Sequence, residues 1–173
     1  MKKKLALIAL IAGLGFSKAH SQTIPDPLNK LFRLEGNWMA LTTMVLDGNT
    51  FTFNYYASFV RNAENSGMYM EEHFSIPDLG ELKGYNLIGF NARDEKIHWF
   101  SVDNFGTTHE HLGYWISDDH FIMSVTEKHD GKKFEETIEM TFLDDSHLSF
   151  HVVAKNANSV FEEITGIFER MPD

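Results

Sequence analysis

Apolar and polar residues alternate along most of the chain, so that every second side chain is apolar. Near the C-terminus, Ile138, Met140 and Phe142 fall on one side of a segment, and polar residues fall between them. Leu148 and Phe150 belong to another segment with the same alternation. A period of two residues is typical of β-strands that bury one face. The pattern therefore predicts a mostly β protein.

Clusters of turn-forming residues interrupt the alternating segments at short intervals. They lie at 47–49, 62–67, 92–95, 104–106, 117–119, 129–131, 144–146 and 156–159. This spacing leaves about ten strands joined in chain order, and such neighbours pair antiparallel. We predict a single antiparallel up-and-down β-barrel of about ten strands, of the calycin or lipocalin-like type. A two-sheet sandwich would give the same one-sided alternation and remains the alternative.

The N-terminal residues have the pattern of a secretory signal peptide. Lysines at 2–4 precede an apolar run at 5–16, and the small residues Ala19 and Ser21 follow just before a cleavage site. The apolar run is too short for a permanent membrane helix. We therefore expect cleavage of residues 1–21, export to the periplasm or the extracellular medium, and no stable membrane insertion of the mature chain.

The segment 22–35 follows the predicted cleavage site and differs from the rest of the chain. Leu28, Leu31 and Leu34 have the spacing of one apolar helix face, which predicts a short helix of one or two turns. The remaining residues, 36–171, are predicted to form the barrel domain.

Composition and charge exclude several classes of protein. The chain has 173 residues, of which 43% are hydrophobic, so it can bury a core as one domain. It has no cysteine, which excludes disulfides, thiolate metal sites and thiol nucleophiles. Lys and Arg number 15 against 25 Asp and Glu, and this net charge of -10 argues against a nucleic-acid partner.

Two residues near opposite ends of the barrel domain resemble a known motif. Gly36 and Trp38 stand at the start of the first predicted strand, and Arg170 stands near the end of the last. This arrangement resembles lipocalins and fatty-acid-binding proteins, in which a Gly-x-Trp motif opens the barrel and a basic residue packs across the indole. The resemblance implies that Trp38 and Arg170 close one end of the barrel.

Further motifs lie between these ends. The segment 84–91, the Ser-Val-Asp at 101–103, the Gly-Lys-Lys at 131–133 and the acidic turn at 144–145 resemble the bacterial domain-of-unknown-function family fifteen seventy-nine. Members of that family are similar to lipocalins in shape, and the resemblance spans roughly 31–171. The family has no general activity, so the resemblance implies a fold rather than a reaction.

Aromatic and methionine residues are concentrated in the central and later strands, and alternation would point about half of them inward. We predict that the lumen binds a small, largely apolar ligand. Its wall would be aromatic, and a carboxylate and two imidazoles would orient the ligand. The predicted ligand-binding residues are Tyr85, Phe100, Asp103, His109, His111 and Trp115. Phe100 and Asp103 lie an odd number of residues apart, so an unbroken strand cannot point both into the lumen.

His109 and His111 lie two apart and share a strand face, where paired imidazoles can bind one divalent metal ion. Further ligands would come from His73, His98 or Asp103. The alternative is that both histidines are solvent-facing or bound by water. We expect no cofactor. The sequence leaves two exceptions open: a divalent metal ion, or haem held by one histidine. The candidate haem ligands are His73, His98, His109, His111 and His151.

No established catalytic motif is present. The sequence lacks a P-loop, a Gly-x-Ser-x-Gly motif and a dinucleotide-binding glycine pattern. Glu71 and His73 share a strand face and offer one acid–base pair. The alternative function is a pocket enzyme, such as a metal-assisted hydrolase, an isomerase or a cyclase, that uses His109 and His111. A third hypothesis is an interaction module with an exposed strand edge. The sequence leaves the ligand's identity and the oligomeric state open.

Overall fold

The computed structural model describes residues 26–77, 79–129, 131–157 and 159–172. The predicted signal peptide at 1–21 lies outside these residues. One short helix, α1 (Asp26–Leu31), and a 3-10 turn, η1 (Phe32–Leu34), precede all strands. The strands are β1 (Gly36–Leu46), β2 (Asn49–Arg61), β3 (Gly67–Ile76), β4 (Gly80–Asn91), β5 (Lys96–Asp103), β6 (Thr108–Trp115), β7 (His120–His129), β8 (Lys132–Phe142), β9 (His147–Asn156) and β10 (Ser159–Arg170).

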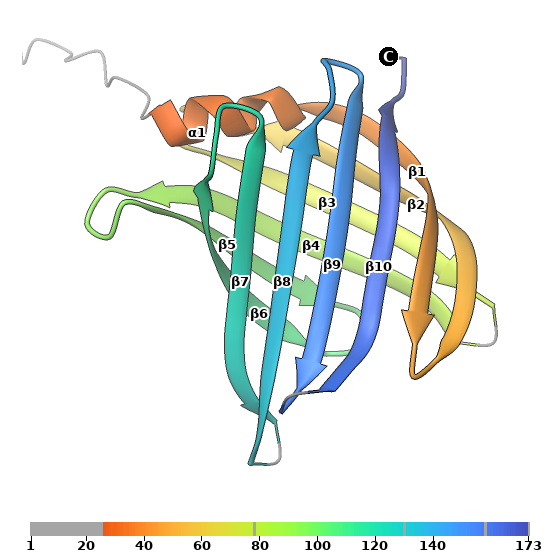
Figure 1. The fold of residues 1–173 in the computed structure, drawn as a ribbon. Coiled ribbons are helices and arrows are strands. Elements are labelled where there is room, and N and C mark those ends of the chain that lie inside the picture. The colour runs from red at the N-terminus through yellow and green to blue at the C-terminus, as the bar shows by residue number, and fades with distance from the viewer. Residues whose placement is uncertain (1–25, 78, 130, 158, 173) are drawn as a thin grey trace, which may run out of the picture.

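Each strand pairs antiparallel with the next one along the chain, and β1 pairs with β10, so the sheet closes on itself (Figure 1). The predicted up-and-down barrel with a short N-terminal helix is confirmed, and the two-sheet sandwich is excluded. Closure pairs the two strands that would otherwise be sheet edges. The interaction module that docks through a free strand edge therefore loses its structural basis.

Within the described ranges, no helix has both the length and the apolar character needed to span a bilayer.

Alternation along each strand places apolar side chains inside the barrel. In β9, Leu148, Phe150 and Val152 are buried at every second position. They belong to one continuous core that fills the barrel next to α1 and lines its lumen farther away. Period-two burial of this kind follows from the pleat, which sends successive side chains to opposite faces.

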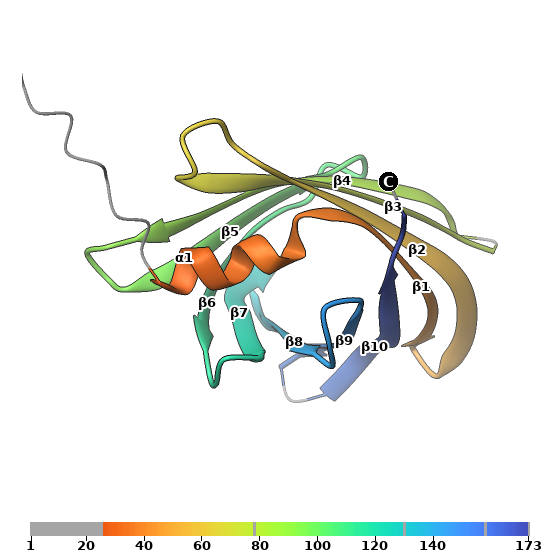
Figure 2. The same cartoon turned by 90° about the horizontal axis from the view of Figure 1, so that it is seen from above.

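The short helix covers one end of the barrel. Leu28 and Leu31 of α1, with Phe32 and Leu34 of η1, are buried against the core. Figure 2 looks down on this end and shows α1 lying across it. The hairpins that join β1 to β2, β3 to β4, β5 to β6, β7 to β8 and β9 to β10 lie at the opposite end, which we call the far end (Figure 1).

Trp38 and Arg170 join the first and last strands at the helix-covered end. They are direct partners in the β1–β10 register, and the guanidinium carbon lies 4.1 Å from the centroid of the indole. Trp38 Nε1 donates to the Leu34 carbonyl at 2.7 Å. Arg170 donates to the carbonyls of Arg33 and Glu35, and to that of Asp145 at 3.0 Å. One side chain thus links β10 to η1 and to the β8–β9 turn.

Replacement of Arg170 by Met should lower the free energy of unfolding by about 2–4 kcal/mol, because it removes a cation–π contact and leaves three backbone carbonyls without their donor. The measurement is urea denaturation of the mature chain. Arg93→Met is the control, since Arg93 lies exposed in the β4–β5 turn. Equal midpoints for the two variants would show that Arg170 does not stabilise this end.

Candidate functional site

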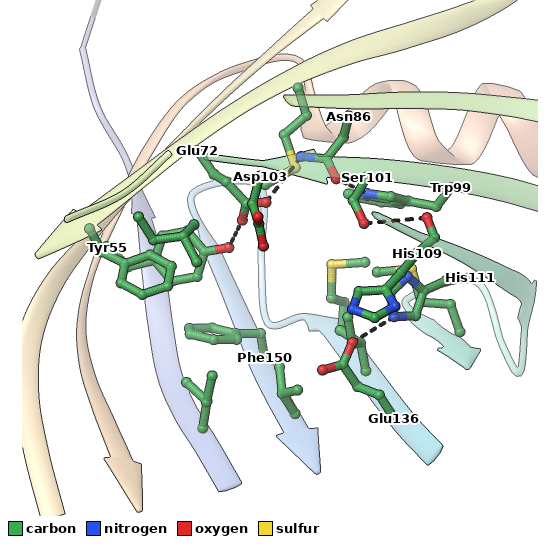
Figure 3. A pocket seen from close by; sticks show the side chains of 18 of the residues that line it. Tyr55, Glu72, Asn86, Trp99, Ser101, Asp103, His109, His111, Glu136 and Phe150 are labelled. Carbon is green, nitrogen blue, oxygen red and sulfur yellow. Dashed lines mark hydrogen bonds and ion pairs between the residues drawn. The ribbon is translucent and has the colours of Figure 1, made fainter. Parts of the chain in front are cut away.

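A cavity of about 250 Å³ lies inside the barrel. Most of its wall is apolar and comes from β2, β3, β4, β5, β7, β8, β9 and β10. The apolar lining residues are Phe59, Met70, Phe74, Leu82, Trp99, Val102, Met123, Ile138, Met140, Leu148, Phe150, Val152, Ile164 and Phe168. Polar side chains also point into it, and Figure 3 shows how they project into the lumen from several strands. The polar lining residues are Tyr55, Glu72, Asn86, Ser101, Asp103, Thr107, His109, His111, Glu136 and Glu162.

Two of the four lining carboxylates stand on either side of a glycine. Gly84 of β4 is the register partner of Glu72 on β3 and of Asp103 on β5. A Cβ at Gly84 would collide with the Glu72 carboxylate. The absent side chain therefore leaves room for Glu72 to lie over β4, on the lumen side of the sheet.

Glu72 is held by a chain of hydrogen bonds (Figure 3). It accepts from the Tyr55 hydroxyl and, at 3.1 Å, from Asn86 Nδ2. Asn86 in turn accepts from the Trp99 indole at 2.9 Å. Burial raises the pKa of Glu72, with a smaller contribution from the Glu136 charge, while the two donors lower it. Burial and the Glu72 charge also raise the pKa of Tyr55 well above its usual value, so the hydroxyl stays protonated.

Asp103 is engaged by backbone at the β5–β6 turn. Its Oδ1 accepts the amide N–H groups of Phe105 at 2.8 Å and Thr107 at 2.9 Å. These bonds close the turn and fix the carboxylate at the rim of the lumen. Asp103 therefore has a structural role in the turn in addition to lining the cavity.

The other two lining carboxylates stand on either side of an alanine. Ala154 of β9 is the register partner of Glu136 on β8 and of Glu162 on β10. A β-bulge between Val160 and Glu162 shifts the register just before this row. Burial and the Glu136 charge raise the pKa of Glu162 to about 7. Two carboxylates therefore share one side of the lumen with only a methyl group between them.

His111 is buried, with 4% of its surface exposed, and its Nε2 lies 2.6 Å from Glu136 Oε2. Its Nδ1 has no hydrogen-bond partner among the described residues. His109 lines the same cavity, stacks on Phe134 and has its Nδ1 3.2 Å from Glu127 Oε2. Each lumen histidine is thus paired with a carboxylate of its own.

The centroids of the two histidine rings lie 5.9 Å apart, and the ring planes are inclined by 68°. Within the described part of the chain, no group of three or more His, Asp or Glu side chains is arranged to hold a metal ion. His98, expected as a further ligand, lies on the outer face between Asp94 and Glu110, and His73 stacks on Tyr56 outside the barrel. The predicted metal set is therefore not assembled, and metal or haem binding at His109 or His111 stays a prediction.

Two of the predicted wall residues lie on the wrong face. Tyr85 is 58% exposed and Phe100 is 42% exposed, and neither lines the cavity. In β4 and β5 the inward positions have the opposite parity, so Trp99 and Asp103 face the lumen instead. Phe100 and Asp103 cannot both point into the lumen, because no bulge separates them, and it is Asp103 that points inward.

Trp115 points inward as its parity with His111 predicts, but it does not line the cavity. It packs against Phe121 and Phe142 at the helix-covered end, and its Nε1 donates to the Pro27 carbonyl at 2.9 Å. The prediction of a wall residue is corrected: the indole supports α1. Likewise, His73 with Glu71 faces outward, so that predicted acid–base pair lies outside the cavity.

Seven polar lining residues were not among the predicted site residues, and four of them are central to the site: Glu72, Asn86, Glu136 and Glu162. A signal existed for these four, since each is a polar exception within a mostly apolar row of alternating positions. Glu136 precedes Ile138 and Met140 in such a row, and Glu72 follows Met70. Glu162 likewise precedes Ile164 and Phe168 at alternating positions, although a bulge separates it from Val160.

No protein-family model matches the chain, and no curated protein matches its sequence. A similar solved structure is that of the S-type phycobiliprotein lyase CPES from Guillardia theta. It has a TM-score of 0.62 and 13% identity, and the alignment covers 91% of this chain and 98% of that one. A putative outer membrane protein from Bacteroides fragilis NCTC 9343 aligns with a TM-score of 0.24, 8% identity, and 83% and 99% coverage. The first likeness agrees with a lipocalin-like barrel.

Replacement of Glu162 by Gln should stabilise the fold at about pH 8 by about 1–3 kcal/mol. The folded-state pKa of about 7 exceeds the ordinary 4.5, so folding favours the protonated acid. Stability from this group is present at low pH and is lost as pH rises through about 7. The free energy of unfolding, measured with urea across about pH 5–8, should therefore fall less steeply with rising pH for E162Q than for the parent.

The control for this change is Glu163→Gln, which removes the same charge from the neighbouring, exposed position. E163Q should keep the slope of the parent protein. Parallel curves for E162Q and the parent would contradict the assigned pKa.

Proposed function

We propose that the barrel binds a small ligand with a largely apolar body in its lumen. The observation that carries the proposal is the cavity of about 250 Å³, whose wall is mainly aromatic, aliphatic and methionine side chains. Enclosed apolar space with a few converging polar groups is the usual form of a small-molecule site. Asp103, His109 and His111 remain the proposed polar contacts, joined by Glu72, Glu136 and Glu162.

The likeness to a solved lyase supports the lipocalin-like barrel that encloses the lumen. The Guillardia theta protein is a phycobiliprotein lyase, and the aligned region covers nearly all of both chains. At 13% identity the comparison bears on the fold alone. The identity and chemistry of the ligand must therefore be argued from the side chains of this lumen.

Export and family membership belong to the same proposal. The lysines at 2–4 and the apolar run at 5–16 support secretion, which would place the barrel in the periplasm or outside the cell. The motifs at 84–91 and 101–103 support membership of the bacterial domain-of-unknown-function family fifteen seventy-nine.

Filling the lumen should abolish binding. Val152 lines the cavity, and its neighbour Val153 points to the outer face. Octan-1-ol should bind the parent protein in isothermal titration calorimetry, and Val152→Trp should weaken that binding at least about tenfold because the indole occupies the cavity. Val153→Trp, the matched control, should bind like the parent. Equal binding by both variants would place the ligand outside the lumen.

A second function is favoured by one specific observation, the pairing of buried His111 with Glu136. A carboxylate on Nε2 orients the imidazole and leaves Nδ1 as a base inside an apolar cavity. This is the arrangement of a proton-transfer enzyme, such as an isomerase or a cyclase. It requires no metal.

The reporter 5-nitrobenzisoxazole, which reacts when any positioned base removes one proton, tests this second function. Ring opening should be faster with the protein than with buffer alone, and His111→Ala should lower the rate at least about tenfold. His151→Ala is the control, since His151 pairs with Glu163 on the outer face. A rate that survives His111→Ala would exclude His111 as the base.

A further inference from the structure

The polar part of the cavity wall is strongly biased toward hydrogen-bond acceptors. Four carboxylates line it, from Glu72, Asp103, Glu136 and Glu162. Among the described lining residues, none is lysine or arginine. An enclosed wall of this kind disfavours anionic ligands, because carboxylate repulsion is strong where water is excluded.

The two acidic pairs differ in what they already bind. Glu72 accepts hydrogen bonds from Tyr55 and Asn86, and Asp103 accepts two backbone amides. Those carboxylates are engaged within the protein. The Glu136 carboxylate bonds to His111, and the Glu162 carboxylate makes no hydrogen bond or ion pair with any described residue. The unsatisfied acceptors therefore lie in the second pair.

The register brings this second pair together. Glu136 and Glu162 flank Ala154, so their side chains project from alternate strands over a single methyl group. Alternate strands are about 10 Å apart, and two glutamate side chains can both reach a group bound between them. That the Glu136 charge raises the pKa of Glu162 agrees with this proximity.

His111 gives a second, independent indication of a ligand. The ring lines the cavity, is 4% exposed and has an unpartnered Nδ1 (Figure 3). A carboxylate only accepts, so Nε2 is the donor toward Glu136, and in that neutral tautomer Nδ1 is an acceptor that needs a donor. A buried acceptor without a donor is costly, so a ligand N–H that reaches it would be favoured.

We infer that the ligand is an organic cation, with a protonated amine bound between Glu136 and Glu162 beside His111, and an apolar body in the rest of the lumen. This inference rests on the proposed lumen binding and specifies its ligand class. An ammonium group supplies the positive charge that the two carboxylates need, and a second donor on the ligand would satisfy His111 Nδ1, which points away from Glu136. The apolar body would lie against rings such as Phe150 and Trp99.

The test compares three probes with one eight-carbon chain: octylammonium, octan-1-ol and octanoate. Each is titrated calorimetrically into the mature protein at about pH 8, where an alkylammonium keeps its proton because its pKa is close to that of lysine. Octylammonium should bind at least about tenfold more tightly than octanol, and octanoate should bind most weakly.

Substitution then locates the head group. Glu162→Gln should reduce octylammonium binding to about the level of octanol, leaving octanol binding unchanged. Glu163→Gln removes an equal charge from the outer face and should leave both affinities unchanged. Glu136→Gln is the second variant, and it should act in the same direction as Glu162→Gln.

The outcomes separate the two proposals. If octanol or octanoate binds as tightly as octylammonium, the inference of a cationic ligand is wrong, while the proposal of lumen binding stands. If octylammonium is preferred but Glu162→Gln and Glu163→Gln weaken it equally, the preference is a general effect of net charge and the assigned site is wrong. If no probe binds, both the cation and the proposed lumen binding fail.

Discussion

Pairing of β1 with β10 is the contact on which the rest of the structure depends. It converts a meander of ten strands into a closed barrel, so that one face of every strand is inside and the other is in water. The same pairing places Trp38 opposite Arg170 at the helix-covered end and aligns Glu162 with the lumen near the far end. Closure of the fold and placement of an acidic group thus rely on one set of backbone hydrogen bonds.

Carboxylates inside a mostly apolar lumen oppose folding, because charge is costly away from water. This electrostatic cost is reduced in different ways at the pair Glu72 and Asp103 and at the pair Glu136 and Glu162. Glu72 accepts hydrogen bonds from side chains, and Asp103 accepts them from the backbone of a turn. Glu162 instead has its pKa raised to about 7, so it is readily protonated and neutral. Groups that retain an unfavourable electrostatic environment are often functional, since ligand binding can relieve it.

The two proposed functions, binding and proton transfer, would use the same His111–Glu136 pair in two ways. A ligand that donates to Nδ1 would remain unchanged, whereas a substrate with an acidic C–H would lose its proton there. In both cases Glu136 orients the imidazole and the apolar wall excludes water. The two functions are therefore distinguished by what enters the lumen rather than by any different arrangement of the side chains.

The sequence by itself determined the β class, the number and order of strands, the short helix and the Trp38–Arg170 pair, because alternation, turns and short motifs are local. It also predicted His109, His111 and Asp103 as lumen residues, and these three do line the cavity. It misassigned Tyr85 and Phe100, since alternation defines two faces without saying which one is inside. Only the tertiary structure decided that choice, through closure of the barrel. It also brought Glu136 and Glu162 together across Ala154, because partners on alternate strands depend on register and on a bulge.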